Sequence, residues 1–334
     1  MNKEGSGIIM AQKDLSSKLL ESEPDVFADI FNALLFTSEE TKIVNPENNL
    51  RDESTEGFYR GNSGELRAVF QDIAKGYRNG DLESYLACFN IENEAVVKRT
   101  VPLKCLGYKY TTLKKQQDLY ENKRRALLDL KQKAKDSNEL EKCKLFEEEI
   151  SKLGAFHTIP FISIVLNFDD KRWNEPTNLA DLNFDSIYSQ FDQPFYIRVF
   201  DVKFFTAEER AKFVSDFRIF LEMFCTNTLP KELEDVSLKH PTELVDMVIA
   251  FTNNDKLKGI RNKVAVDELE GKMTNMGDIF DNVAAKEAVD SARFYYKKGI
   301  SQDVVIEGIS ERLGITLDEA KDIFEKEVLM LETV

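Results

Sequence analysis

Three carboxylates are the residues whose types and spacing are best suited to chemistry in this chain of 334 residues. Asp72 is followed, after nineteen residues, by the pair Glu92-x-Glu94. Acids two residues apart on a strand share one face, and acids at the ends of neighbouring strands can converge. Carboxylates grouped without His or Cys are hard oxygen ligands for Mg²⁺ or Mn²⁺, and such a metal would activate water for attack on a phosphate. The alternative is that the ends of two strands carry solvent-facing acids, in a chain with 60 acidic residues.

The second chemical signal is a basic segment within an acidic protein. The net charge is −15, yet between Lys98 and Lys135 twelve Lys and Arg residues stand against three acids, a local balance of +9. Such a segment is typical of a surface that follows nucleic-acid phosphates, although a solvated helical face is the alternative. The residues that we predict to contact DNA are Lys98, Arg99, Lys104, Lys114, Lys115, Lys123, Arg124 and Arg125.

Composition disfavours several other kinds of site. The chain has only two histidines, His157 and His240, which argues against zinc sites built from His and Cys and against a Ser-His-Asp triad. Its four cysteines lie far apart with no CxxC pair, so we expect free thiols in a reducing compartment. No apolar run approaches the roughly 20 residues that cross a bilayer, and the first residues lack the apolar core of a signal peptide. We therefore expect a cytoplasmic protein with no membrane partner.

The hydrophobic pattern predicts the elements that must position these side chains. The acids fall on two predicted strands, 66–75 and 84–94, in the first half of the chain. Before these strands we predict a helix over 24–36 and a loop over 37–65 with a weak strand near 42–44. After them we predict a helix over 101–117 and one or two long helices over 116–152, with a break at 136–138 and a capping box from Asn138 to Glu141. The last elements before residue 230 are a buried strand over 159–168, a strand over 195–202, and a helix from a Thr206–Glu209 capping box through 216–224.

The chain beyond Pro230 is predicted to be helical, with marked helix starts at Ser301 and Thr316. The element order therefore predicts an α/β domain with an all-helical C-terminal extension. We place a flexible leader over 1–14, the α/β domain over 15–229 with a helical insertion at about 112–153, and the helical region over 230–334.

A homodimer through the helical insertion or the C-terminal helices is a further expectation. The apolar residues Leu119, Leu127, Leu130 and Ala134 recur at a spacing compatible with a coiled-coil seam. The alternative is that this stripe packs on its own domain.

Five segments, in order along the chain, carry a resemblance to a known family. They are FADIFNALLF, FQDIAK, CFNIENE, VPLKCLGYKYTTL and IPFISIVLNFDDKRWNEPTNLADL, within roughly residues 25–229. Together they resemble the recombination-promoting nuclease and transposase-like family, a bacterial branch of the PD-(D/E)XK nuclease superfamily. One departure is Gln71, which stands where the family usually has Arg. The resemblance implies a restriction-endonuclease-like core and a Mg²⁺- or Mn²⁺-dependent DNA endonuclease linked to recombination or mobile elements.

The resemblance also implies roles for individual residues. Asp72 and Glu92 match the metal-binding carboxylates, and Asp29 on the first helix matches an assisting catalytic acid. Glu94 would complete the metal site, but it stands where the superfamily has Lys and the family usually has Gln. An ionised Glu only accepts hydrogen bonds, whereas Lys or Gln donates one to water or phosphate. Two interpretations therefore stay open, an active endonuclease and a catalytically degenerate module that binds DNA or protein, with a regulator acting through the helical tail as a third.

Overall fold

The structure of the chain is a computed structural model. It describes residues 13, 15–36, 38–53, 56–60, 66–70, 73–78, 86–182, 193–272 and 274–329. The chain divides into two compact units, one from Glu21 to Phe205 and the other formed by the segment up to Leu20 with the chain from Thr206 onward. The first unit is mixed α/β, and the described part of the second is helical, which confirms the predicted combination of α/β and all-helical regions.

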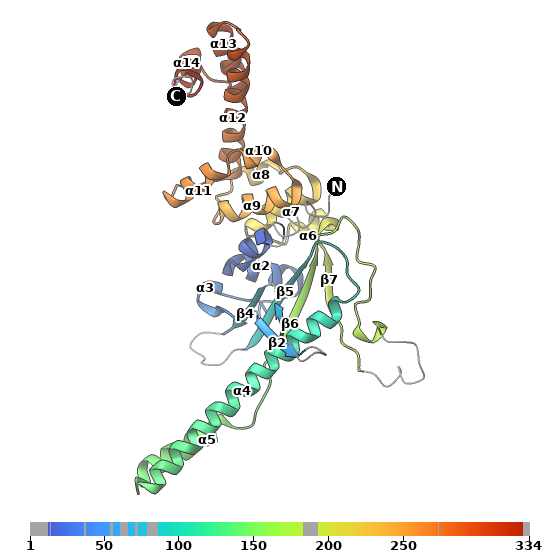
Figure 1. Ribbon diagram of the computed structural model, residues 1–334, viewed down its shortest axis with the longest axis vertical. Helices are drawn as coiled ribbons and strands as arrows, with labels where there is room; N and C mark the ends of the chain where they lie inside the picture. The colour runs from blue at the N-terminus through green and yellow to red at the C-terminus, as the bar shows by residue number, and fades with distance from the viewer. Residues whose placement is uncertain are drawn as a thin grey trace. The chain divides into compact units, whose positions relative to one another are not determined.

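A five-stranded mixed sheet forms the centre of the α/β unit (Figure 1). In spatial order its strands are β1 (Leu50–Asp52), β4 (Ile73–Tyr77), β5 (Ala87–Glu94), β6 (Phe161–Asn167) and β7 (Arg198–Asp201). Strands β1, β4 and β5 are antiparallel neighbours, whereas β5, β6 and β7 run parallel. The carboxyl ends of β5, β6 and β7 therefore lie along one edge of the sheet.

The first predicted strand is in fact two strands in different sheets. β3 (Leu66–Phe70) pairs with β2 (Glu56–Arg60) in a two-stranded sheet, and β4 begins at Ile73 in the main sheet. Side chains alternate through both segments, so the sequence pattern does not show that the second segment pairs in a different sheet. The loop predicted over 37–65 is also wrong in part, because it contains α3 (Pro46–Asn49), β1 and β2.

The weak strand predicted near 42–44 does not form. The backbone amide of Ile43 donates to the Asn32 side chain at 2.8 Å, which ties this irregular segment to the preceding helix. The short strand of this region is β1, which follows six residues later.

Helix α2 (Pro24–Leu34) covers one face of the sheet. It begins at Pro24, as predicted, because proline fixes a helical φ and needs no hydrogen-bond acceptor in the first turn. The Phe31 ring of α2 lies 4.9 Å from the Phe89 ring of β5. Side chains alternate along a strand, so residues 89, 91 and 93 of β5 face α2, and residues 88, 90, 92 and 94 face the other side.

Helix α4 (Val101–Asp136) lies on that other face and then extends beyond the sheet (Figure 1). Near its start, Val101 and Cys105 pack with Val165 of β6 in a small apolar cluster. Helix α5 (Leu140–Leu153) runs back along α4, and Lys131 of α4 pairs with Glu147 of α5 at 2.8 Å. We call residues 112–153 the arm.

The turn between α4 and α5 confirms the predicted break but not the predicted capping box. Asn138 adopts a left-handed φ of 57°, which ends the first helix, and Glu139 rather than Asn138 caps the second without a side-chain hydrogen bond. The predicted apolar stripe is divided, because Ala134 is buried whereas the Leu119 side chain is 71% exposed. Packing on its own hairpin therefore accounts for only part of the stripe.

The helical unit includes α6 (Ala207–Arg210) and α7 (Asp216–Thr226), which the sequence assigned to the α/β domain. The division therefore falls after Phe205 instead of after Leu229. Phe220 and Phe224 of α7 pack edge-on against Phe251, with ring centroids 5.5 and 5.6 Å apart. Because Phe251 lies on α9 (Pro241–Thr252), this aromatic contact joins α7 to the helices that follow it.

The helix predicted from Thr206 through residue 224 is interrupted. The capping box between Thr206 and Glu209 is confirmed, but α6 ends at Arg210 and a second cap at Ser215 starts α7. The buried pair of Arg210 with Glu222, 2.8 Å apart, joins the two helices across the break.

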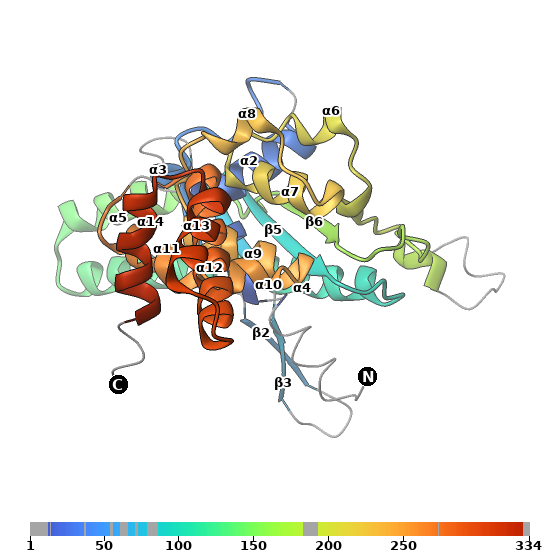
Figure 2. The ribbon, with the colours of Figure 1, turned by 90° about the horizontal axis from the view of Figure 1, so that it is seen from above.

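The last helices form a small bundle of their own, in which α12 (Met276–Lys297), α13 (Gln302–Leu313) and α14 (Leu317–Ile323) lie side by side (Figure 2). The helix starts predicted at Ser301 and Thr316 are confirmed.

None of the described helices is long and apolar enough to cross a membrane. The remaining short elements are α8 (Lys231–Glu234), α10 (Asp255–Lys258), α11 (Arg261–Leu269), the 3-10 turns η1 (Leu179–Leu182) and η3 (Val202–Phe204), and the π-helical turn η4 (Phe324–Leu329).

Candidate functional site

Glu92 and Glu94 lie on the α4 side of β5, where they are 0% and 2% exposed. Lys104 of α4 forms an ion pair with Glu92 Oε1, and its Nζ lies 3.5 Å from Glu94 Oε1. Lys98, in the connection from β5 to α4, places its Nζ 2.8 Å from Glu94 Oε2. The structure thus brings together two of the predicted acids with two of the cations that we predicted to contact DNA.

Asp72 lies outside the described residues. Ile73, the next residue in the sequence, pairs with Ile91, the residue before Glu92. In the part of the chain that the structure describes, no group of three His, Cys, Asp or Glu side chains is arranged to hold a metal ion. The role of Asp72 as a metal ligand stays a prediction.

Asp29 is a buried residue of α2, 6% exposed. Helix α2 packs through Phe31 on the Phe89 side of β5, whereas Glu92 and Glu94 lie on the α4 side. The helix that carries Asp29 therefore covers the opposite face of the sheet from these two acids. Its role as an assisting acid stays a prediction.

The donor atoms on the α4 side of β5 fit a hard divalent cation. Glu92 and Glu94 offer carboxylate oxygens, and the Oδ1 of Asn90, on the same strand face, has no hydrogen-bond partner among the described residues. Burial and the Glu92 carboxylate raise the pKa of the Cys105 thiol to about 12, so this neighbour stays protonated and supplies no thiolate at neutral pH. Oxygen donors without a soft ligand favour Mg²⁺ or Mn²⁺ over Zn²⁺, with Glu92 and Glu94 as the residues that would hold it.

Polar side chains continue from this site along the edge of the parallel strands. Glu94, Asn167 and Asp201 end β5, β6 and β7 at neighbouring register positions. Asn167 Nδ2 donates to Asp201 Oδ1 at 2.8 Å and to the backbone oxygen of Lys171 at 3.0 Å. These bonds fix the loop after β6 beside the end of the sheet.

The same loop is also joined to the connection after β5. Asp169 accepts hydrogen bonds from the backbone amides of Val97, at 3.2 Å, and Lys171, at 3.1 Å. Burial opposes ionisation of Asp169, but the hydrogen bonds from these two amides and the charge of Lys171 favour it, and the pKa of the Asp169 carboxyl is lowered. The side chain is therefore an ionised acceptor that holds the two loops together.

Four exposed cations lie on these two joined loops, and we call them the cationic edge: Lys98, Arg99, Lys171 and Arg172. Sequence reasoning found the first two and missed the second two. The available signal was the pair of basic residues shortly after the predicted buried strand of residues 159–168. Arg172 stacks on Phe204 with its guanidinium carbon 4.6 Å from the ring centre, which orders the side chain while leaving it exposed.

The other predicted DNA contacts lie on α4 and differ in how their charge is offset. Lys114 pairs with Asp118 at 2.9 Å, and Lys115 is half-buried. By contrast, three consecutive cations farther along the arm are exposed and form no ion pair within the described ranges. They are Lys123, Arg124 and Arg125.

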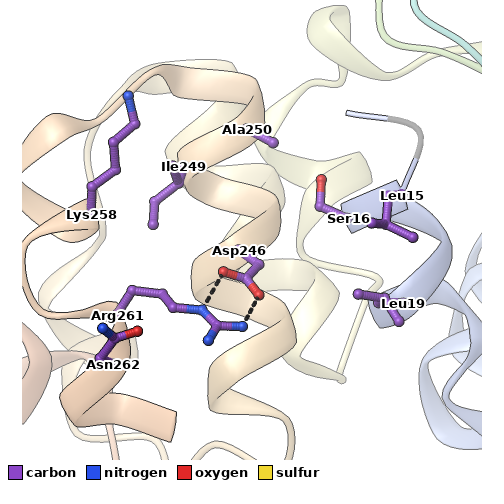
Figure 3. A pocket seen from close by; sticks show the side chains of 9 residues that line it. All are labelled: Leu15, Ser16, Leu19, Asp246, Ile249, Ala250, Lys258, Arg261 and Asn262. Carbon is purple, nitrogen blue, oxygen red and sulfur yellow. Dashed lines mark hydrogen bonds and ion pairs between the residues drawn. The ribbon is translucent and has the colours of Figure 1, made fainter. Parts of the chain in front are cut away.

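The helical unit has a cavity of about 390 Å³ that is a separate candidate site (Figure 3). Leu15, Leu19 and Ile249 supply much of its apolar wall. Its principal polar feature is Arg261, which donates to Asp246 through two bonds of 2.8 and 2.6 Å. Because this ion pair is satisfied within the cavity wall, the cavity offers weaker grounds for chemistry than the carboxylates of β5.

The chain shows no significant match to any protein-family model, curated protein or solved structure.

Proposed function

We propose that this protein is a DNA endonuclease that hydrolyses phosphodiester bonds with Mg²⁺ or Mn²⁺, linked to recombination or mobile elements. The observation that carries the proposal is the burial of two carboxylates, Glu92 and Glu94, on one strand face directly beside the cationic edge. Burying two like charges is costly unless cations offset them. Lys98 and Lys104 do so here, and a divalent cation would offset the same two carboxylates.

The same site supports the finer proposal that Glu21–Phe205 is a PD-(D/E)XK restriction-endonuclease-like core. The mixed sheet places the Glu92-x-Glu94 pair on its central strand, at the junction of its antiparallel and parallel halves. The chain then returns through α4 to the parallel strand β6, so that one helix supplies both the apolar cover, through Val101 and Cys105, and the ammonium group of Lys104.

In the proposed reaction, Glu92 and Glu94 hold the metal together with Asp72. A bound Mg²⁺ or Mn²⁺ would activate water and offset the negative charge that develops on the phosphate. The cationic edge positions the DNA backbone, because contacts of Lys and Arg with phosphates fix register without reading sequence. Lys98 supplies a hydrogen-bond donor that an ionised Glu94 lacks.

The second candidate function is a nuclease-derived module that binds DNA and no longer cleaves it. The observation that favours it is the ion pair of Lys104 with Glu92, because it neutralises one proposed ligand without a metal. Binding of DNA through the cationic edge and the arm would be common to both functions.

Nicking of a supercoiled plasmid tests the proposal. We expect the wild-type protein to nick DNA with Mg²⁺ or Mn²⁺ and not with EDTA. The variants Asp72→Ala and Glu92→Ala should each abolish nicking while the protein stays folded, because each change removes a metal ligand at a strand end. If wild-type protein binds the plasmid and leaves it intact under all metal conditions, the binding module replaces the endonuclease.

A further inference from the structure

The position of Lys104 bears directly on how a metal would enter the site. Its ammonium group pairs with Glu92 Oε1 and lies 3.5 Å from Glu94 Oε1, so it contacts one oxygen of each carboxylate. The two carboxylates are 0% and 2% exposed, whereas the Lys104 side chain is 37% exposed. One cation that reaches in from solvent therefore offsets two buried anions.

A divalent cation held by both carboxylates would compete with Lys104 for the same oxygens. The remaining oxygen of Glu94 is already paired with Lys98 at 2.8 Å. Removal of the Lys104 ammonium would therefore leave Glu94 partly compensated and would open the side of both carboxylates that faces α4.

The Lys104 ammonium group can also move away from the two carboxylates without a change in the fold. Lys104 lies in the first turn of α4, and its flexible four-carbon stem lets the ammonium move into solvent while the backbone stays in place. The neighbouring helix residues Val101 and Cys105 anchor this turn to the sheet through the apolar cluster with Val165. The Lys104 side chain can therefore move while the first turn of α4 keeps its place on the sheet.

We propose that Lys104 is an internal counter-ion that occupies the divalent-cation position between Glu92 and Glu94, and that metal binding releases it. This inference rests on the metal site of the proposed function but not on cleavage. It predicts that Lys104 lowers the affinity of the protein for the metal but raises the stability of the metal-free protein. Without metal, Lys104 stabilises the fold, and with metal it competes for the ligands.

The test compares wild type with Lys104→Met and with Lys131→Met, at constant pH and without DNA. Methionine keeps most of the stem and removes the charge. Lys131 is the matched control, because it lies on the same helix about 40 Å away and also loses an ion pair, with Glu147. The measurements are Mn²⁺ titration calorimetry and thermal unfolding with Mn²⁺ or EDTA.

We expect the Lys104→Met variant to unfold at a lower temperature than wild type in EDTA and to recover in Mn²⁺. Its Kd for Mn²⁺ should be about tenfold lower than that of wild type, a difference of about 1.4 kcal/mol. Lys131→Met should bind Mn²⁺ as wild type does. If the Kd of Lys104→Met is equal to or above that of wild type, the inference is wrong.

A second measurement uses the wild-type protein and decides the matter even if Lys104→Met fails to fold. Acetylation followed by peptide mass spectrometry reports the accessibility of each lysine amine. Mn²⁺ should increase acetylation of Lys104 and leave Lys131 unchanged. Unchanged labelling of Lys104 at an Mn²⁺ concentration that calorimetry shows to be saturating would overturn the inference.

The outcomes also separate this inference from the proposed function. Release of Lys104 by Mn²⁺ without any nicking would support the counter-ion role of Lys104 and contradict the proposed endonuclease function. The opposite outcome is metal-dependent nicking with no change in Lys104 labelling and no gain in Mn²⁺ affinity for Lys104→Met. It would support the endonuclease function and contradict the counter-ion role of Lys104.

Discussion

The backbone amide of Val97 donates a hydrogen bond of 3.2 Å to Asp169 Oδ2, across 72 positions of sequence. This bond joins the connection after β5 to the loop after β6. As a result, Lys98 and Arg99 lie on a loop next to the one that carries Lys171 and Arg172. A single charged edge is thus assembled from two sequence segments beside the buried carboxylates.

The first prediction concerns this edge. The double variant Lys171→Ala/Arg172→Ala should weaken DNA binding and reduce the slope of log K against log salt by up to about 1.8, since each lost phosphate contact contributes about 0.9. Fluorescence anisotropy with a labelled duplex across a salt series measures the slope. The matched control is Lys321→Ala/Lys326→Ala, which removes two exposed cations from the C-terminal helices. An equal loss in this control would mean that only net charge matters.

The second prediction concerns the arm, where the structure distinguishes paired from unpaired cations. Replacement of Lys123, Arg124 and Arg125 by Ala should lower the salt slope by up to about 2.7, on the same basis of phosphate contacts. Lys114→Ala should change it less than a fully free cation would, because Asp118 already offsets that charge at 2.9 Å. The same anisotropy series checks both variants. A slope that stays at the wild-type value in the triple variant would identify the arm as a solvated face.

The third prediction concerns Glu94. If the protein is active, Glu94→Gln should weaken metal binding by on the order of tenfold, the effect of losing about 1.4 kcal/mol of attraction, yet keep or raise nicking at saturating Mg²⁺. The reason is that the amide restores a hydrogen-bond donor while one anionic ligand is lost. If the wild type is inactive, Glu94→Gln or Glu94→Lys should produce measurable nicking.

A Mg²⁺ titration of plasmid nicking, with Asp72→Ala as the blank, measures this effect. The endonuclease proposal fails if wild type and both Glu94 variants match the blank while they still bind DNA.

The fourth prediction concerns the buried thiols. Burial and the charge of Glu53 raise the pKa of Cys88 to about 11, and burial and the charge of Glu92 raise that of Cys105 to about 12, from an ordinary value of 9.0. Because the native pKa values are raised, the unfolded chain loses these protons first. The stability that the thiols contribute is therefore fully present below about pH 9 and is lost progressively from pH 9 to pH 12.

Alkylation by iodoacetamide checks this prediction. At pH 8 the half-buried Cys143 and Cys225 should react in the native protein, whereas Cys88 and Cys105 should stay unmodified. All four should react in guanidinium chloride, which serves as the control. Native Cys105 reacting as fast as Cys143 would contradict the burial that the structure assigns to it.

Local signals in the sequence account for most of the correct predictions. Pro24 and the Thr206 and Thr316 capping boxes mark helix starts through contacts within four residues, so no distant partner is needed. The Glu92 and Glu94 side chains share a face because a strand has a period of two. The sequence also predicted the mixed α/β character and the helical region after it.

The errors arise where long-range pairing decides the result. Residues 66–70 and 73–77 continue one alternating pattern, but they join different sheets because β3 pairs with β2, whereas β4 pairs with β5. Asn138 has the residue type of a helix cap, yet it adopts a left-handed φ because the chain must reverse there for α5 to pack along α4. The segment 207–226 follows the α/β domain in sequence but buries its aromatic rings against Phe251.

For the candidate site, the sequence by itself determined which residues carry charge and which acids share a strand face. Only the tertiary structure decided that Lys104 reaches Glu92 and that Lys171 and Arg172 belong to the same edge as Lys98. The physical reason is that charge and period are properties of neighbouring residues. The pairing of a buried carboxylate, by contrast, depends on which helix packs over its strand, and that choice is made by apolar contacts of residues such as Val101 and Cys105 with β6.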